Sequence, residues 1–97
     1  MDVSEIQKAV LDCLRSVGVP RVLVTTIYAL SDEPAEVDVA RVAKQDTFFV
    51  EFVATREEFE QFRECANAKG VWIRKDFRPF DKAGRFSYAV IAVEMRR

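Results

Sequence analysis

The last third of the chain constrains the fold most, because two apolar segments there flank a short charged loop. Residues 71–77 and 85–95 are rich in β-branched and aromatic side chains, which favour strands. The loop between them holds Pro79, Gly84 and several charges, a composition typical of a hairpin turn. These residues therefore predict two antiparallel strands joined as a β-hairpin.

Two segments of the chain have the periodicity of amphipathic helices. Apolar residues recur at three- and four-residue steps over residues 2–17, and Gly18 follows at a position suited to ending a helix. The second segment, residues 55–69, begins with Thr55 followed three residues later by Glu58, the pattern of a capping box. We expect each helix to lay one apolar stripe on a sheet.

Three further strands are predicted between the two helices. They cover residues 21–30, 36–44 and 47–53, and short polar turns separate them. The element order is then α-β-β-β-α-β-β. Consecutive strands joined by short turns pair antiparallel. The sequence predicts a single α+β domain over residues 1–97, a two-layer sandwich whose mainly antiparallel five-strand sheet carries both helices on one face.

The last predicted strand is apolar on both of its faces. A two-layer sandwich needs only one apolar sheet face, so the second would remain uncovered unless something else packs on it. A second copy of the chain is the simplest occupant, and we expect a homodimer. Loops folded over the face are the alternative. The residues predicted for self-contact are Tyr88, Val90 and Ala92 on one face, or Ile91 and Val93 on the other.

The composition excludes several kinds of catalytic site. The chain has no His, which removes the common nucleophile–imidazole pairs and the imidazole ligands of metal ions. Its three Gly residues are isolated and form no phosphate-binding loop. We expect no enzymatic activity, no metal site and no cofactor.

The positive charge of the chain is concentrated near its C-terminal end. Residues 65–97 hold 8 basic and 3 acidic side chains, whereas residues 1–64 hold 7 basic and 13 acidic ones. Cations interleaved with aromatic rings suit nucleic acid, whose phosphates and bases they contact. Acidic neighbours dilute this charge, and the same residues can instead keep a sheet edge soluble. The candidate patch for nucleic acid or a partner is Trp72, Arg74, Lys75, Arg78, Lys82 and Arg85.

Two cysteines, Cys13 and Cys65, lie on the predicted apolar sides of the two helices. We interpret them as small buried side chains, and as a disulfide pair only if the helices pack side by side. The sequence shows no apolar run of membrane-spanning length and no signal peptide, so we expect a cytoplasmic protein. The leading hypothesis is a small non-enzymatic regulatory protein that self-associates and binds a protein partner, with nucleic-acid binding as the alternative.

Overall fold

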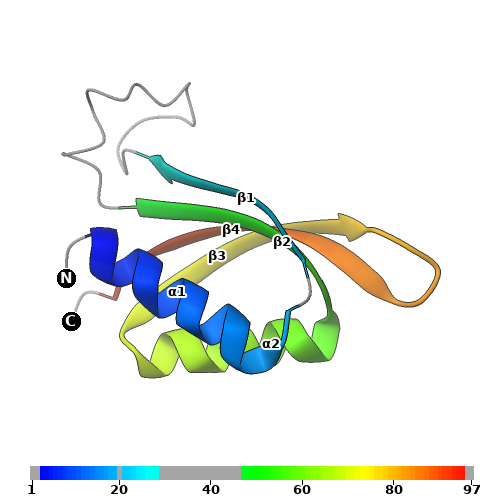
Figure 1. Ribbon diagram of the computed structural model, residues 1–97, viewed down its shortest axis with the longest axis horizontal. Coiled ribbons are helices and arrows are strands. Elements are labelled where there is room, and N and C mark those ends of the chain that lie inside the picture. Colours follow the sequence, from blue (N-terminus) through cyan, green and yellow to red (C-terminus); the bar gives the residue numbers. More distant parts are fainter. Residues whose placement is uncertain (1–2, 20, 29–46, 96–97) are drawn as a thin grey trace.

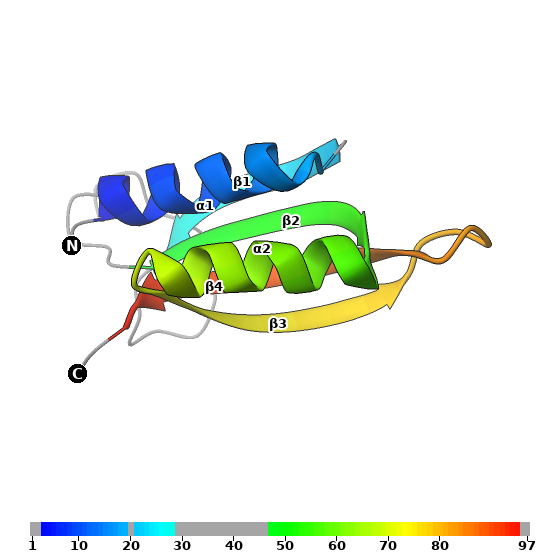
Figure 2. The ribbon, with the colours of Figure 1, turned by 90° about the horizontal axis from the view of Figure 1, so that it is seen from below.

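The computed structural model describes residues 3–19, 21–28 and 47–95 of the chain. Their four strands form one antiparallel sheet in the order β1-β2-β4-β3. Both helices lie on the same side of this sheet, as Figures 1 and 2 show from two directions. The elements are α1 (Val3–Val17), β1 (Arg21–Tyr28), β2 (Thr47–Thr55), α2 (Arg56–Ala68), β3 (Val71–Pro79) and β4 (Arg85–Glu94).

This arrangement confirms the predicted α+β class and the placement of both helices on one face. The predicted strand at residues 36–44 lies outside the described residues, so the sheet described here has four strands instead of five. The strand that is apolar on both faces, β4, lies between β2 and β3. An interior position suits it, because both of its edges then find hydrogen-bonding partners.

Local sequence signals explain where α2 begins and ends. The Thr55 hydroxyl accepts a hydrogen bond of 3.2 Å from the Glu58 N–H, and the Glu58 carboxylate accepts one of 2.8 Å from the Thr55 N–H. The predicted capping box is therefore confirmed. After the helix, Gly70 has a φ of 83°, which a residue with a Cβ rarely adopts. That left-handed residue turns the chain directly into β3.

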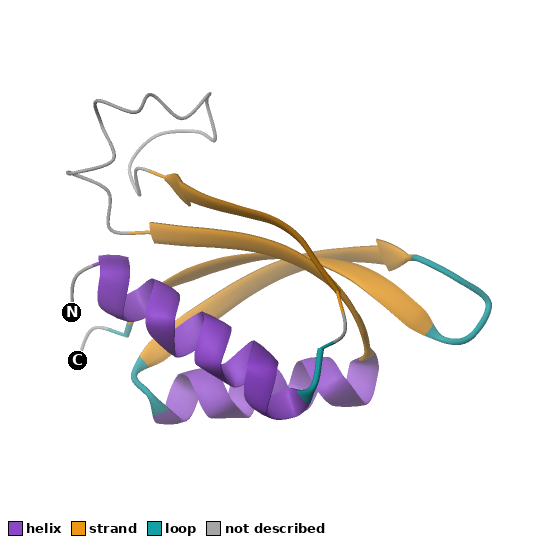
Figure 3. Cartoon of the chain, viewed as in Figure 1, coloured by secondary structure: helices purple, strands orange, loops and turns teal. Residues whose placement is uncertain are grey.

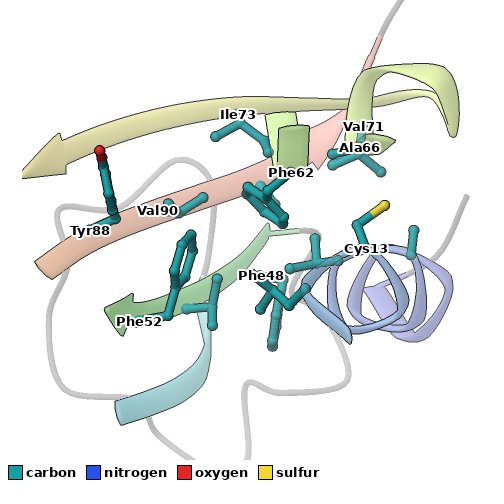
Figure 4. Close-up of a cluster of buried hydrophobic side chains, with 14 of the residues drawn as sticks. Cys13, Phe48, Phe52, Phe62, Ala66, Val71, Ile73, Tyr88 and Val90 are labelled. Atoms are coloured by element: carbon teal, nitrogen blue, oxygen red, sulfur yellow. The ribbon is translucent and has the colours of Figure 1, made fainter. Parts of the chain in front are cut away.

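The core lies between the two helices and one face of the sheet. Four aromatic side chains form its centre, and the ring centroids of Phe59 and Tyr88 are only 4.4 Å apart. Burying a ring of this size contributes roughly 1.5–3 kcal/mol, so this cluster is a large part of what holds the helices down. Figure 4 shows how side chains from β2, β3, β4 and both helices meet in this layer. The four aromatic residues are Phe52, Phe59, Phe62 and Tyr88.

A disulfide joins the two helices across this core. Cys13 of α1 and Cys65 of α2 have Cα atoms 5.7 Å apart and are bonded through their sulfur atoms. The sequence left this pairing open because it depends on whether the helices lie side by side. They do, and Cys13 is fully buried while Cys65 is half-buried. The bond therefore ties α1 to α2 over the same face of the sheet.

Candidate functional site

The two faces of β4 differ in how deeply their side chains are buried. Tyr88, Val90 and Ala92 lie under the helices and are at most 1% exposed. They are core residues. The first of the two predicted self-contact faces is therefore covered by the helices of the same chain. Ile91 and Val93 alternate with them along the strand and are only half-buried. The face that carries this second pair is the one that the two helices do not cover.

We call the side of the sheet away from the helices the open face. On its β3 border, Trp72 is paired with Val93 and Arg74 with Ile91. Trp72 is 49% exposed, which is unusual for the largest apolar side chain of a protein. Trp72 and Arg74 of the predicted basic patch thus lie beside Val93 and Ile91, the second of the two predicted self-contact faces. The open face of β2, β3 and β4 includes Phe49, Glu51, Trp72, Arg74, Asp76, Arg78, Ala89, Ile91 and Val93.

The predicted basic patch does not form one surface. Trp72, Arg74 and Arg78 lie on the open face, but Lys75 alternates with them and lies on the helix side. The Lys75 ammonium is 4.2 Å from the centroid of the Phe59 ring in α2. Strand alternation at β3 separates the residues that sequence proximity had grouped.

The remaining two cations of the patch, Lys82 and Arg85, lie at the hairpin turn. The Asp81 carboxylate accepts hydrogen bonds from the Ala83 N–H at 3.0 Å and from the Arg85 side chain at 2.7 Å. Desolvation acts to raise the pKa of Asp81, but the hydrogen bonds from Arg85 and Ala83 and the Arg85 charge outweigh it, so this pKa lies below its usual value. Arg85 is therefore a structural cation of the turn, which projects past the helices in Figure 3.

Small Ala89 leaves a shallow hollow in the open face. The hollow has a volume of about 180 Å³ and is lined by acidic Glu51 and Asp76 as well as by cationic Arg78. Ser87 lies on its floor and is 8% exposed. The open face therefore presents both signs of charge around an apolar centre.

A second hollow of about 190 Å³ opens on the helix side, beside the start of α2. Arg56, which lines this hollow, is not among the residues predicted from the sequence, although its position as the first residue of α2 gave a signal. The phase of Lys75, which matches that of buried Val71 and Ile73, could likewise have placed Lys75 beside the helix. The lining residues are Arg56, Glu60, Lys75, Phe77 and Tyr88.

The described residues hold neither a metal-binding cluster nor a membrane-spanning helix. Residues 3–19, 21–28 and 47–95 contain no group of three or more side chains that would suit a metal ion. Within the same ranges, no helix has the length and apolar character needed to cross a membrane. Comparison of the chain with protein-family models, curated proteins and solved structures gave no match. The open face and the hollow on the helix side are the two surfaces of the described residues that combine charged and aromatic side chains.

Proposed function

We propose that this protein is a small non-enzymatic interaction protein that forms a homodimer through its open face. The observation that carries the proposal is the order of side chains along β3, the border strand of that face. Read from its start, the open-face positions are aromatic, cationic, acidic and cationic. This series is complementary to its own reverse. The four residues are Trp72, Arg74, Asp76 and Arg78.

A two-fold axis makes use of this order. The axis would lie between the two sheets, across the strands, and pass between the rows at Arg74 and Asp76. It would place Arg74 of one copy opposite Asp76 of the other, and Trp72 opposite Arg78. The first pair is an ion pair and the second is a cation–π contact. Each occurs twice, as an isologous interface requires.

The apolar centre of the face fits the same arrangement. Across the same axis, Ile91 of one copy lies opposite Ala89 of the other, where the hollow offers room. Removing apolar area from water contributes about 25 cal/mol per Å², and this is the main driving force for such a contact. Large Ile91 packed against small Ala89 would also fill space closely, as side chains do in protein cores.

The test is a charge exchange across the proposed axis, read by sedimentation at micromolar concentration. Arg74→Asp and Asp76→Arg each place like charges opposite one another, so each should shift the protein toward its 11.1 kDa monomer. The double variant restores opposite charges in the reversed sense and should regain the dimer. That recovery would not follow from a general loss of stability.

A matched control exchanges the signs of Glu60 and Arg63, an exposed ion pair on the outer side of α2. This double variant should sediment as the wild-type protein does. The proposal fails if the wild-type chain is monomeric throughout the micromolar range. It also fails if the double variant at Arg74 and Asp76 is no better than the single variants.

Nucleic-acid binding is the second candidate, and exposed Trp72 with Arg74 and Arg78 on one face favours it. Against it, Glu51 and Asp76 lie on the same face and would repel phosphates. Binding of single-stranded DNA or RNA at low salt, weakened by Arg74→Ala with Arg78→Ala, would support this candidate over self-association. Absence of binding at low salt would eliminate it.

The proposal also includes recognition of another protein. It includes a cytoplasmic location as well, although one feature of the structure argues against that location. The Cys13–Cys65 disulfide weighs against the cytoplasm, because thiols there are normally kept reduced. The test is to quench the cells in acid, unfold the protein so that buried Cys13 is also accessible, alkylate the free thiols and measure the mass. A protein that is fully alkylated comes from a reducing compartment, whereas an unmodified one comes from an oxidising compartment.

A further inference from the structure

The hollow on the helix side combines features that a merely structural surface does not need. It is bounded by Arg56 and Glu60 of α2, Lys75 and Phe77 of β3 and Tyr88 of β4. Its volume of about 190 Å³ is below the roughly 300 Å³ at which sites for drug-sized ligands begin. A space of this size suits one chemical group.

The polar end of Tyr88 has no hydrogen-bonding partner among residues 3–19, 21–28 and 47–95. The residue is 1% exposed, and its ring is stacked among Phe52 and Phe59. In Figure 4 its side chain runs from β4 toward β3, with the oxygen at the end away from Phe52. No residue in the described part of the chain hydrogen-bonds to this hydroxyl, whereas buried polar groups usually find a partner. Because Tyr88 is one of the residues that line the hollow, this is the place where its hydroxyl could gain a partner.

Two cations converge on the same place. The Lys75 ammonium lies 5.6 Å from the centroid of the Tyr88 ring and 5.4 Å from that of Phe77. The Arg56 guanidinium lies 6.0 Å from the Phe77 centroid. Neither cation forms an ion pair with a carboxylate in the described ranges, and each instead lies over aromatic rings. Their charges are positioned by the fold but not neutralised.

The Tyr88 hydroxyl is protonated at neutral pH, as in any ordinary tyrosine, whose pKa of about 10 lies well above 7. Desolvation raises the pKa of this group above its usual value, while the nearby Arg56 charge lowers it and the Glu60 charge raises it. At neutral pH the group is therefore a hydrogen-bond donor. Glu60 is the one acidic side chain in the lining, and its carboxylate pairs with Arg63 on the outer side of α2. Three donors thus face the hollow.

We propose that this hollow binds a single oxyanion, a carboxylate or a phosphate group, held by Lys75, Arg56 and the Tyr88 hydroxyl. Both cations form charge-assisted hydrogen bonds with such a group, and the buried hydroxyl gains the partner it lacks. The half-exposed Phe77 ring forms an apolar wall beside the bound group. The site lies on the other side of the sheet from the open face, so it does not depend on the proposed dimer.

The experiment is a titration of the isotope-labelled full chain with sodium phosphate and with sodium acetate, followed by amide chemical shifts at constant ionic strength. Saturable shifts centred on Lys75, Tyr88 and the start of α2 are expected with at least one of the two anions. The anion that saturates first identifies the class of ligand. Absence of saturable shifts with both anions, or equal shifts with sodium chloride, overturns the proposal.

Two variants assign the binding to this site. Lys75→Met should weaken the saturating anion about tenfold, as expected for loss of one charge-assisted hydrogen bond. Tyr88→Phe retains the ring and removes only the hydroxyl, so it should weaken binding about fivefold with the fold intact. Arg74→Gln, on the same strand but on the open face, is the matched control and should bind as the wild type does. If Tyr88→Phe also binds as the wild type does, the proposed site is wrong.

Discussion

The two faces of β4 carry similar side chains but occupy different environments. On one face, Tyr88, Val90 and Ala92 are covered by α1 and α2 and take part in the core. On the other, Ile91 and Val93 are half-buried and lie next to exposed Trp72. Hydrophobicity by itself does not distinguish the two sets. Which face is the core follows from which face the helices cover, and helices reach only one side of a two-layer sandwich.

The difference also explains how charge is distributed on β3. Residues in phase with the core include Lys75, whose ammonium lies against aromatic rings. Residues in phase with the open face include Arg74 and Asp76, which flank the apolar centre of that face. One strand therefore supplies two surfaces with separate chemistry. Self-association is our proposal for the open face, and anion binding is our proposal for the hollow on the helix side.

The largest expected difference between the two faces of β4 is their response to the same introduced charge. Val90→Asp puts an unpaired carboxylate in the core and should cost more than about 4 kcal/mol of the free energy of unfolding. Ile91→Asp should cost about 1 kcal/mol when both proteins are compared as monomers at high dilution, because water reaches this side chain in the single chain. Urea denaturation followed by circular dichroism measures both. Equal losses in the free energy of unfolding would mean that Val90 and Ile91 are buried to the same extent.

The next prediction concerns how much the Cys13–Cys65 disulfide contributes to holding both helices over the covered face. Cys13 and Cys65 are separated by 52 residues. Removing a cross-link that closes a loop of this length should lower the free energy of unfolding by about 2–4 kcal/mol. We expect this loss for Cys65→Ala, measured by urea denaturation. Wild-type protein in reducing agent should lose a similar amount, and the variant should be insensitive to the reductant. A variant as stable as the wild type would show that packing of α1 and α2 suffices without the bond.

The smallest expected effect concerns the turn that sets the register of β3 against β4. The pKa of Asp81 is lower in the folded protein than its reference value of 3.8, so the charged form stabilises the fold. That contribution is present above the unfolded pKa and is lost as the pH falls through the folded pKa. It should therefore disappear only in strongly acidic solution. A carboxyl titration by NMR with a midpoint at or above 3.8 would contradict this expectation.

Asp81→Asn provides the matching variant for that titration. The amide oxygen can still accept the hydrogen bond from the Ala83 N–H, but the charge that pairs with Arg85 is gone. The acid-dependent part of the stability at this turn should be absent in the variant. A slip of one residue in this hairpin would exchange the two faces of β3, so register is also checked by the amide shifts of both strands.

Local order in the sequence determined most of the secondary structure. The capping box at Thr55, the glycine after each helix and the charged loop before Arg85 each act through neighbours in the chain. Their effect can be predicted because the interacting groups are only a few residues apart. The α+β class followed from the order of these elements. The predicted strand over residues 36–44 lies outside the described residues and remains a prediction.

Tertiary structure decided everything that depends on which elements meet. The sequence placed Cys13 and Cys65 on apolar stripes, but only helix packing brought their Cα atoms to 5.7 Å. It grouped Lys75 with Arg74, but strand alternation under α2 placed them on opposite faces. It made both faces of β4 apolar without indicating which would be covered. The physical reason is that burial depends on contacts between distant segments, whereas sequence patterns record only local periodicity.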